Sequence, residues 1–583
     1  MKTVKILLKS LRENKRYAIL TLIFIIGEAI IETFIPFVTA KIVSSIQYGE
    51  AITEVLKTGA LLVAMAGGSL LCGRVAAKTC ATASVGYARN LRHDLFAKVQ
   101  TFSFANIDKF SSTSLVTRIT TDVGNIQMSF MMLIRTAIRS PLMLIFSSVM
   151  AFVMGGWLGM TFVIIIPLLG FGLFMIGRKA MPAFKSVFKK YDKLNESIEE
   201  NVRGMRVVKG FAREEYEKEK FGAAAETIRK DFTKAERIVA LQNPMMTLSM
   251  YINMFVVLLV GSYLAITSGG ATIDVAGISS MILYGMQVLM SLMMLSMVYV
   301  MINISVASAR RICEVLEEKP ILTNKEDAVK KVKDGSIEFN GVSFKYKEDA
   351  IKYALEEVNL KIESGMTVGV LGGTGAGKST LVQLIPRLYD VSEGSVKVGG
   401  VDVREYDMTT LRDNVAMVLQ KNLLFSGTIK DNLKWGNPDA TDEEIKQACV
   451  LAQADEFVTS FADGYDTFIE QGGTNVSGGQ KQRLCIARAL LKKPKILIMD
   501  DSTSAVDTKT DAYIRHSMET YIHETTKIII AQRVASVEKA DMIIVMDGGK
   551  IVAVGKHEEL MKNNEIYRDI YMQQNRGGAA DEE

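Results

Sequence analysis

Long apolar runs with few charges fill most of the chain before residue 310, whereas charged and apolar residues are mixed throughout the remainder. A helix needs about 20 apolar residues to cross a bilayer. Two runs are long enough for two helices each, with breaks at Gly155-Gly156-Trp157 and at Ser268-Gly269-Gly270. Six spans are therefore predicted: one within 17–46, one from 58 to beyond 71, two within 140–177 and two within 238–309.

Lysine and arginine are distributed unevenly between the connections. Residues 178–237 are heavily basic, but the short connections near 47–56, 155–157 and 268–275 contain no Lys or Arg. Because cytoplasmic loops of membrane proteins carry excess positive charge, both termini are predicted to be cytoplasmic. The basic ends of the spans also account for the net charge of +5. The lipid bilayer, and not nucleic acid, is therefore the predicted partner, in a multi-pass protein of a bacterial inner membrane.

The two longer connections are predicted to be helical. Each has about 50 residues with apolar positions at helical spacing and few Gly or Pro residues. The membrane helices should therefore continue well beyond the bilayer.

The composition changes at residue 319. Residues 1–318 are predicted to form the membrane domain, and 319–335 are polar and read as a linker. Strand-like patterns begin after Gly335, so residues 336–575 are predicted to form a soluble domain. Residues 576–583 contain no large apolar side chain and are expected to be a disordered tail.

A glycine-rich motif follows an apolar strand and precedes a helix-like stretch. This is the context of a phosphate-binding loop, in which backbone N–H groups and a helix N-terminus converge on phosphates. Lys378 should reach the terminal phosphates, and Ser379 and Asp500 should hold Mg²⁺. The motif consists of Gly372, Gly373, Thr374, Gly375, Ala376, Gly377, Lys378, Ser379 and Thr380.

A second motif, Ser477-Gly478-Gly479-Gln480, precedes the apolar strand 496–499 that ends in Asp500 and Asp501. Together with the phosphate loop, it resembles the signature of ABC transporters of the exporter type (type IV, membrane domain fused to ATP-binding domain). The resemblance covers essentially the whole chain. It implies an all-α six-helix transmembrane domain joined to an α/β P-loop ATP-binding domain, with ATP and Mg²⁺ as cofactors.

The resemblance also assigns further residues. Tyr346 is similar to the aromatic residue that stacks on adenine, and Gln420 to the glutamine that contacts Mg²⁺. The stretch 504–507 resembles the D-loop, while 114–118 and 204–214 lie near the family's coupling helices. In this family two such halves bind ATP between the phosphate loop of one and the signature of the other. Ser477 to Gln480 would therefore act on a partner's nucleotide.

Two positions depart from the family pattern. The family has Glu after the Mg²⁺-binding Asp, where this chain has Asp501, and a switch His where this chain has Gln532. None of the four histidines lies at a matching position. Asp501 is one methylene shorter than Glu, and Gln532 cannot carry a positive charge. The pair resembles the degenerate-site subunit of bacterial heterodimeric multidrug exporters.

Two assemblies are compatible with these departures. In an asymmetric heterodimer, a different chain with Glu and His would perform most of the hydrolysis. In a homodimer, both ATP sites would be weak.

Charged residues inside the spans are costly and usually face a cavity or a partner charge. Glu28 and Glu32 lie one helical turn apart, and Arg135 and Arg139 lie near or inside another span. A substrate pathway and a structural Glu–Arg pair explain them equally well. Met290 and Met294 belong to a methionine-rich last span that suits varied apolar substrates, although membrane packing is the simpler reading.

The favoured function is ATP-driven export of amphipathic small molecules, including drugs, with a slight preference for cations. Export of lipids or peptides by a homodimer is the alternative. An ATP-gated channel or sensor is disfavoured because no long regulatory insertion is present.

Overall fold

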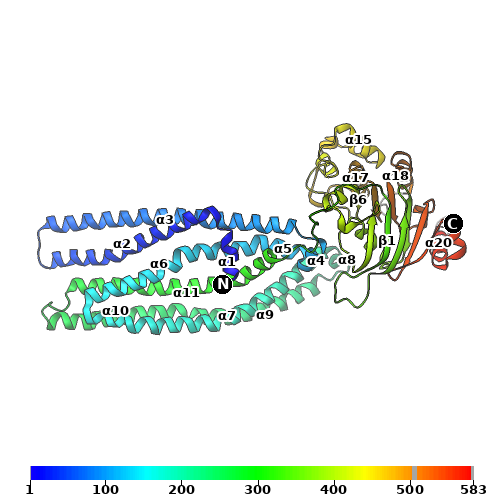
Figure 1. The fold of residues 1–583 in the computed structure, drawn as a ribbon. Coiled ribbons are helices and arrows are strands. Elements are labelled where there is room, and N and C mark those ends of the chain that lie inside the picture. Colours follow the sequence, from blue (N-terminus) through cyan, green and yellow to red (C-terminus); the bar gives the residue numbers. More distant parts are fainter. Residues whose placement is uncertain (1, 502–507, 579–583) are drawn as a thin grey trace. The chain divides into compact units, whose positions relative to one another are not determined.

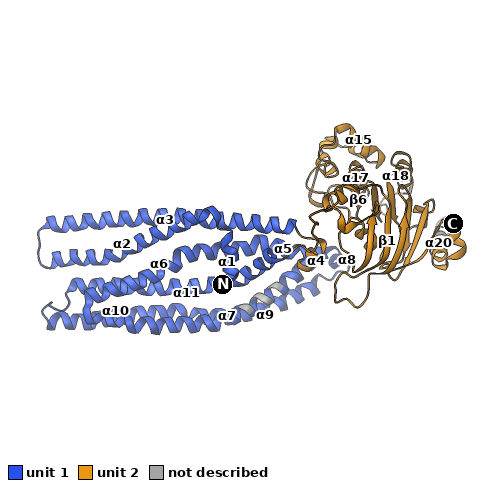
Figure 2. Cartoon of the chain, in the orientation of Figure 1, with its two compact units in different colours: residues 1–101, 111–318 blue, residues 102–110, 319–583 orange. Residues whose placement is uncertain are grey.

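The structure, a computed structural model, describes residues 2–501 and 508–578. It divides into two compact units (Figure 2). Unit 1 comprises residues 1–101 and 111–318, and unit 2 comprises residues 102–110 and 319–583.

Unit 1 is helical (Figure 1). Its long helices run side by side, and the chain reverses direction at short turns, so that α6 and α7 form a hairpin around Gly156. The helices are α1 (Lys2–Lys9), α2 (Lys15–Gln47), α3 (Ile52–Gln100), α5 (Ser112–Thr117), α6 (Val123–Gly155), α7 (Met160–Arg203), α8 (Met205–Gly210), α9 (Glu214–Ala240), α10 (Gln242–Thr267) and α11 (Val275–Glu317).

Five helical segments in the described chain are long and apolar enough to cross a membrane. One of them, Ser112–Phe184, contains both α6 and α7, which the turn Gly156–Gly159 separates. The helices α2, α3, α6, α7, α10 and α11 therefore correspond to the six predicted spans. At 49 residues, α3 is about 74 Å long, more than twice the apolar thickness of a bilayer.

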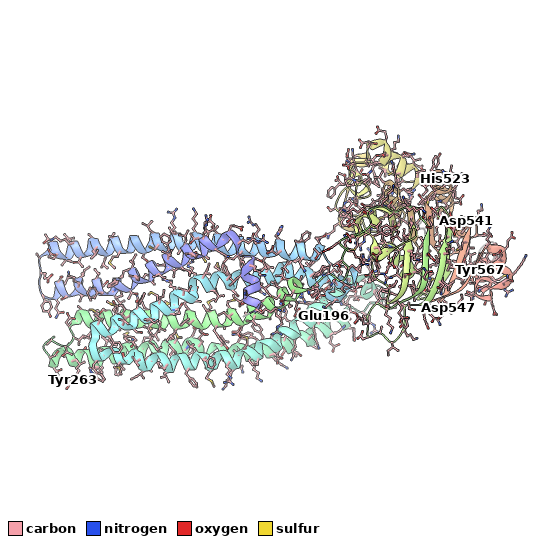
Figure 3. All side chains as sticks on the ribbon, viewed as in Figure 1. Glu196, Tyr263, His523, Asp541, Asp547 and Tyr567 are labelled. Carbon is pink, nitrogen blue, oxygen red and sulfur yellow. The ribbon has the colours of Figure 1, made fainter. Side chains whose placement is uncertain are left out.

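Glu196 on α7 and Tyr263 on α10 lie toward opposite ends of the helical unit (Figure 3). At the Tyr263 end, Asp274 caps α11 by accepting a hydrogen bond from the Gly277 N–H at 2.7 Å. The capping carboxylate thus marks where the last span begins.

Unit 2 contains a six-stranded sheet of order β12-β11-β3-β10-β9-β6 and a four-stranded antiparallel sheet of order β2-β1-β4-β5. The strands are β1 (Ile337–Phe344), β2 (Leu355–Ile362), β3 (Thr367–Gly372), β4 (Glu393–Val398), β5 (Val401–Asp402), β6 (Val415–Val418), β9 (Ile496–Asp500), β10 (Thr526–Ile530), β11 (Met542–Asp547) and β12 (Lys550–Gly555), with a small pair β7 (Gly427–Thr428) and β8 (Phe468–Ile469). The helices are α4 (Phe104–Phe110), α12 (Lys378–Leu384), α13 (Met408–Asn414), α14 (Ile429–Leu433), α15 (Asp442–Leu451), α16 (Asp455–Ser460), α17 (Gly478–Leu491), α18 (Thr508–Tyr521), α19 (His557–Asn563) and α20 (Glu565–Gly578).

The buried strands of the large sheet divide their side chains between two cores. Along β9, Ile496 and Ile498 join the core shared with β1, β2 and β4, whereas Leu497 and Met499 join the core shared with α15 and α17. This period-two alternation, with apolar residues on both faces, is expected of a parallel strand covered on both sides.

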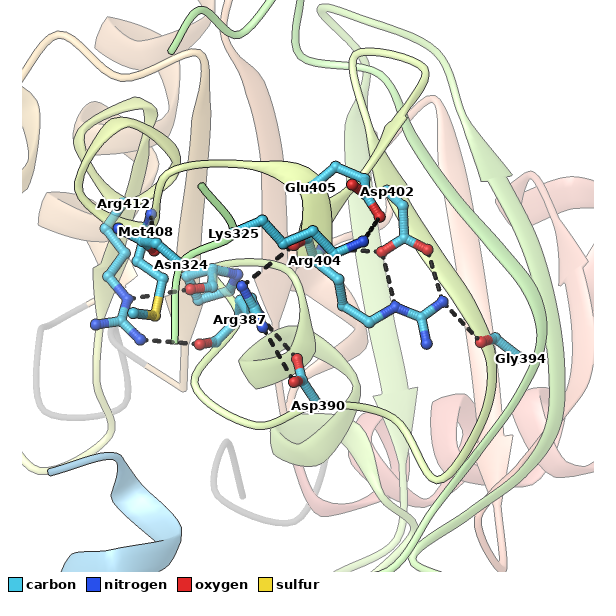
Figure 4. Close-up of polar contacts among 11 residues, drawn as sticks. Asn324, Lys325, Arg387, Asp390, Gly394, Asp402, Arg404, Glu405, Met408 and Arg412 are labelled. Atoms are coloured by element: carbon cyan, nitrogen blue, oxygen red, sulfur yellow. Dashed lines mark hydrogen bonds and ion pairs between the residues drawn. The ribbon is translucent and has the colours of Figure 1, made fainter. Parts of the chain in front are cut away.

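Within unit 2, residues of the linker make polar contacts with the ATP-binding domain (Figure 4). Asn324 donates to Asp407 at 2.6 Å and Lys325 pairs with Glu405 at 2.5 Å. Nearby, buried Arg387 donates to Asp390 at 2.8 Å. At the other end of unit 2, α20 continues to Gly578, and the remaining residues of the expected tail, 579–583, lie outside the described residues.

A short segment between α3 and α5 belongs to the soluble unit. Residues 102–110 are part of unit 2, whereas the following segment 114–118, expected near a coupling helix, is part of unit 1. The short helix α4 is thus the part of the membrane half that packs with the soluble domain. Tyr389 donates to Asp108 at 2.8 Å, and the rings of Phe104 and Tyr389 are 6.1 Å apart.

Candidate functional site

The order of the central sheet brings the predicted nucleotide residues to one edge. Strands β3, β10, β9 and β6 are neighbours and run parallel. Their carboxyl ends therefore open on the same side, where α/β proteins bind ligands. From β3 to β6 these ends carry the phosphate loop, Gln532, the pair Asp500–Asp501 and Gln420.

The glycines of the phosphate loop have two different roles. Gly372 and Gly377 have positive φ, and a Cβ there would lie 2.2 Å from the Met546 carbonyl oxygen and 2.8 Å from that of Ala354. These two positions require glycine because the backbone packs closely. A Cβ on Gly373 or Gly375 would meet nothing within 4 Å. The loop is thus tightly held on one side and open on the other, as a cradle for phosphates requires.

Lys378 begins α12 directly after the loop. Its Nζ donates to the carbonyl oxygens of Gly372 at 2.9 Å and Gly373 at 2.8 Å, so the ammonium group folds back over the loop. Burial lowers the pKa of Lys378, and the nearby carboxylates of Asp500 and Asp501 oppose this shift. The ammonium group is therefore positioned to pair with a phosphate.

Asp500 ends β9 and is 5% exposed. Burial raises its pKa, while a hydrogen bond from Ser379 and the charge of Lys378 favour the ionised form. Carboxylate, hydroxyl and amide oxygens are the hard ligands that Mg²⁺ prefers. The side chains of Asp500, Ser379 and Gln420 therefore fit a magnesium–nucleotide complex.

The carboxylate of Asp501 is already engaged. Its Oδ2 accepts hydrogen bonds from Gln532 Nε2 at 2.6 Å and from Gln420 Nε2 at 3.2 Å. The Asp501 backbone has φ of +49°, outside the usual range for a residue other than glycine. Gln532 is held in turn, because its backbone carbonyl oxygen accepts a hydrogen bond from Gln574 Nε2 on α20 at 2.7 Å. Gln574 was missed by sequence reasoning, since it belongs to no motif.

Tyr346 lies beside the helix that follows the loop. It is 48% exposed, and its hydroxyl lies 2.9 Å from Thr380 Oγ1 and 3.3 Å from Gln383 Oε1. Its ring packs edge-on against Phe344 and Tyr389. An exposed aromatic ring braced next to the phosphate loop is suitably placed to stack on a base.

The signature residues cap α17. Ser477 Oγ accepts from the Gln480 N–H at 3.3 Å, and Gln480 Oε1 accepts from the Ser477 N–H at 2.9 Å, a reciprocal capping box. Gly478 and Gly479 form the first turn between them. Within the described residues no hydrogen bond joins Ser477–Gln480 to the phosphate loop. The stretch 504–507, which resembles the D-loop, lies outside the described residues.

Comparisons with known proteins match both halves of the chain. Residues 18–292 match the ABC transporter transmembrane region, and residues 355–504 match the ABC transporter ATP-binding model. The Bacillus subtilis (strain 168) protein described as "Uncharacterized ABC transporter ATP-binding protein YfiB" is 35% identical over 97% of this chain and 98% of its own length. The chain belongs to the ABC transporter family.

Two further relatives extend this assignment. The ATP-dependent lipid A-core flippase of Desulfotalea psychrophila is 32% identical to this ABC transporter over 83% of the chain and 84% of the flippase. The structure of a bacterial Atm1-family ABC exporter with ATP bound has a TM-score of 0.82 at 24% identity, covering 97% of this chain and 99% of that one. This likeness confirms the predicted fold class, a helical transmembrane domain fused to an α/β ATP-binding domain.

The membrane domain of the transporter has an open cavity of about 580 Å³ lined by α2, α6 and α11. Glu32, Met290 and Met294, three of the four residues predicted for a substrate pathway, line it. Arg139 Nη2 pairs with Glu32 at 2.5 Å and lies 3.6 Å from Glu28, which is buried and does not line the cavity. The predicted Glu–Arg ion pair is therefore present, and it lies at a cavity wall, whereas the substrate pathway stays a prediction.

Helix α6 contributes cavity residues that the sequence did not assign to a pathway. The charges of Arg135 and Arg139 inside a span were the signal in the sequence that could have pointed to the cavity. The sequence did not show the register in which these residues meet α2 and α11. The full lining is Glu32, Ile35, Met131, Met132, Arg135, Thr136, Arg139, Ser140, Met143, Met286, Gln287, Met290, Ser291 and Met294.

Proposed function

We propose that this chain is one half of an ATP-driven exporter, paired with a different chain, and that hydrolysis at its own phosphate loop is slow. The observation that carries this proposal is the state of Asp501. Its Oδ2 accepts from two amides, so one oxygen of the residue at the water-activating position is already engaged within the protein. The exported compounds are amphipathic small molecules, including drugs.

The chemistry of the two substitutions supports slow turnover. Asp501 is one methylene shorter than the Glu that the family uses, and a displacement of about 1 Å of a catalytic group can cost roughly 10²-fold in rate. Gln532 offers a neutral amide where the family has an imidazole, so it neither carries positive charge nor exchanges a proton. Gln532 and Asp501 bond to each other.

The binding residues support retention of nucleotide at this site. Lys378 and the loop N–H groups bind phosphates, Ser379, Asp500 and Gln420 hold Mg²⁺, and Tyr346 stacks on the base. When bound, Mg²⁺-ATP supplies the energy that closes the two ATP-binding domains. The signature residues Ser477, Gly478, Gly479 and Gln480 complete the partner's site, which keeps Glu and His. The basic connections support a cytoplasmic position for both termini and the ATP-binding domain, with the spans in the inner membrane.

The test is ATP hydrolysis by the purified chain alone and with the ABC half encoded beside it. We expect feeble activity alone and strong activity with the partner. The variant Asp501→Glu/Gln532→His should raise the activity of the lone chain by at least about tenfold. Brisk hydrolysis by the unmodified chain alone would instead establish a self-sufficient homodimer.

Lipid export by a homodimer is the second candidate. It is favoured by one relative, the lipid A-core flippase. Translocation of labelled lipid by the lone chain in proteoliposomes would support it over the heterodimer.

A further inference from the structure

Among the described residues, the guanidinium group of Arg135 lies at the cavity wall with no carboxylate within ion-pair distance. Arg135 and Arg139 lie one turn apart on α6 and both line the cavity. Arg139 is balanced by Glu32 and Glu28. Arg135 is half-buried and, among the described residues, makes no hydrogen bond or ion pair. The cavity wall thus contains two Arg and one Glu, with one guanidinium group left for a ligand.

Two other polar groups of the wall are already used within the protein. Gln287 Oε1 accepts from Ser147 at 2.8 Å, and its Nε2 donates to the Glu32 backbone carbonyl at 3.3 Å. Ser291 donates to the Gln287 backbone carbonyl at 2.7 Å. Arg135 is therefore the charged group available to a ligand, beside the neutral hydroxyls of Thr136 and Ser140. An ionised side chain in a span is costly and marks a functional site unless it is paired.

Most of the remaining wall consists of flexible, apolar side chains. Six of the lining residues are methionines: Met131, Met132, Met143, Met286, Met290 and Met294. Methionine side chains are flexible and polarisable, and they adapt to irregular apolar or aromatic surfaces. The wall therefore suits a variable apolar body attached to one fixed charge.

We propose that this cavity takes amphipathic anions, with a carboxylate, sulfonate or phosphate headgroup on Arg135 and an apolar or aromatic body against the methionines. A guanidinium group binds such headgroups through two parallel hydrogen bonds. The proposal rests on the proposed export function and names its substrate class. It reverses the preference for cations drawn from Glu28 and Glu32, because those carboxylates are paired with Arg139.

The test compares three fluorescent probes that share a dansyl group and differ in charge: dansylglycine (anion), dansylglycine amide (neutral) and dansylcadaverine (cation). Binding is measured without ATP to the full-length chain, with its partner where the two co-purify, in phosphatidylcholine nanodiscs. We expect the anion to bind about tenfold more tightly than the amide, and the cation most weakly.

Two variants with opposite expected effects separate charge recognition from folding. Arg135→Gln should remove the preference for the anion and leave binding of the amide unchanged. Glu32→Gln removes the nearer of the two carboxylates that pair with Arg139 and should strengthen anion binding severalfold. The proposal is overturned if the cation binds best, or if Arg135→Gln weakens the anion and the amide equally.

A change in the lipid of the nanodiscs distinguishes an anionic lipid headgroup from a soluble anion as the natural ligand. If nanodiscs containing phosphatidylglycerol suppress dansylglycine binding through Arg135, the natural headgroup belongs to a lipid, and if they do not, it belongs to a soluble compound. ATP hydrolysis does not enter these measurements. A negative result therefore leaves the proposed asymmetry of the ATP site untouched, and a self-sufficient homodimer could still bind anions.

Discussion

Asp500 and Asp501 are adjacent in sequence but have different environments. Asp500 ends β9 with its carboxylate buried beside Ser379. Asp501 is half-buried, donates its N–H to the Ile530 carbonyl at 3.0 Å and directs its carboxylate at two amides. The first arrangement suits a metal ligand, and the second leaves the water-activating position occupied.

Replacing Asp501 should therefore have little effect on turnover. In the assembled transporter, Asp501→Asn should change the ATPase rate by less than about twofold, because Oδ2 is already engaged by two amides and the proposed partner's site performs most of the hydrolysis. Lys378→Ala is the control, since it should abolish nucleotide binding at this loop, as measured with a fluorescent ATP analogue. A large loss of activity in Asp501→Asn would mean that this carboxylate does take part in hydrolysis.

Asp500 should reduce stability when no nucleotide is bound. Burial raises its pKa above the usual value of 3.8, so at neutral pH its ionised form disfavours folding. Asp500→Asn should then raise the Tm by roughly 2–4 °C, or about 1 kcal/mol for a domain of this size. The gain should shrink as pH falls through the raised pKa and vanish below about 3.8, where Asp500 is protonated in both states. The same variant should lose the stabilisation by Mg²⁺-ATP, which scanning fluorimetry would detect.

The identities of the ATP-site residues were readable from sequence because spacing and flanking strands define each motif. Their convergence depends on a sheet order, β3-β10-β9-β6, that no local pattern encodes. The two hydrogen bonds to Asp501 could not be foreseen for the same reason. They join ends of three different strands.

At the scale of the helices, an ion pair with a buried carboxylate joins the start of α6 to the end of α11. Asp122 is fully buried and accepts from Arg311 Nε at 2.7 Å and from Ser308 Oγ at 2.8 Å. Arg311 makes a second bond to the same carboxylate through Nη2. This ion pair thus holds α6 against α11, outside the cavity that both helices line.

Breaking this pair should be costly. Asp122→Asn removes the buried carboxylate that pairs with Arg311 and should reduce the free energy of unfolding by about 3 kcal/mol. The measurement is thermal unfolding of the purified chain in detergent. Glu314→Gln is the matched control: its bridge to Arg118 at 3.1 Å involves a side chain that is 47% exposed, so the loss should stay below about 1 kcal/mol. Equal losses in both variants would refute the argument.

The helices themselves follow from hydropathy, and all six predicted spans match helices in the structure. The sequence did not reveal that α4 joins unit 2, because seven residues, Phe104–Phe110, carry no periodic signal of their own. Nor could it give the register in which α2 meets α6, which decides that Arg139 pairs with both Glu28 and Glu32. Such facts depend on packing between distant segments.

For the whole molecule, the chain passes between the two units three times. It leaves unit 1 after Thr101, returns at Ser111, and leaves again after Glu318. The segment 102–110 and the start of the linker are both parts of unit 2. A rearrangement of unit 2 must therefore act on α3, α5 and α11 through covalent connections.

Asn106 ties these two connections together. It is fully buried, its Nδ2 donates to the Lys319 carbonyl at 3.0 Å, and its Oδ1 accepts from the N–H groups of Ser103 at 3.1 Å and Ile321 at 3.2 Å. One side chain thus holds α4 to the first residues of the linker. Removing it leaves buried backbone groups without partners, at about 1–3 kcal/mol.

We expect Asn106→Ala to separate ATP hydrolysis from transport. Hydrolysis should stay within about twofold of the unmodified protein, because no nucleotide residue is touched, whereas ATP-dependent uptake into inside-out vesicles should fall about tenfold. The matched control is Asn324→Ala, which removes similar bonds, to Asp407 at 2.6 Å and from the Met408 N–H at 3.0 Å, farther along the same linker. Among the described residues, Asn324 has no hydrogen bond to α4, so Asn324→Ala should retain transport. Parallel losses of hydrolysis and transport in both variants would indicate damage to the fold, and coupling would then have to be sought in other segments.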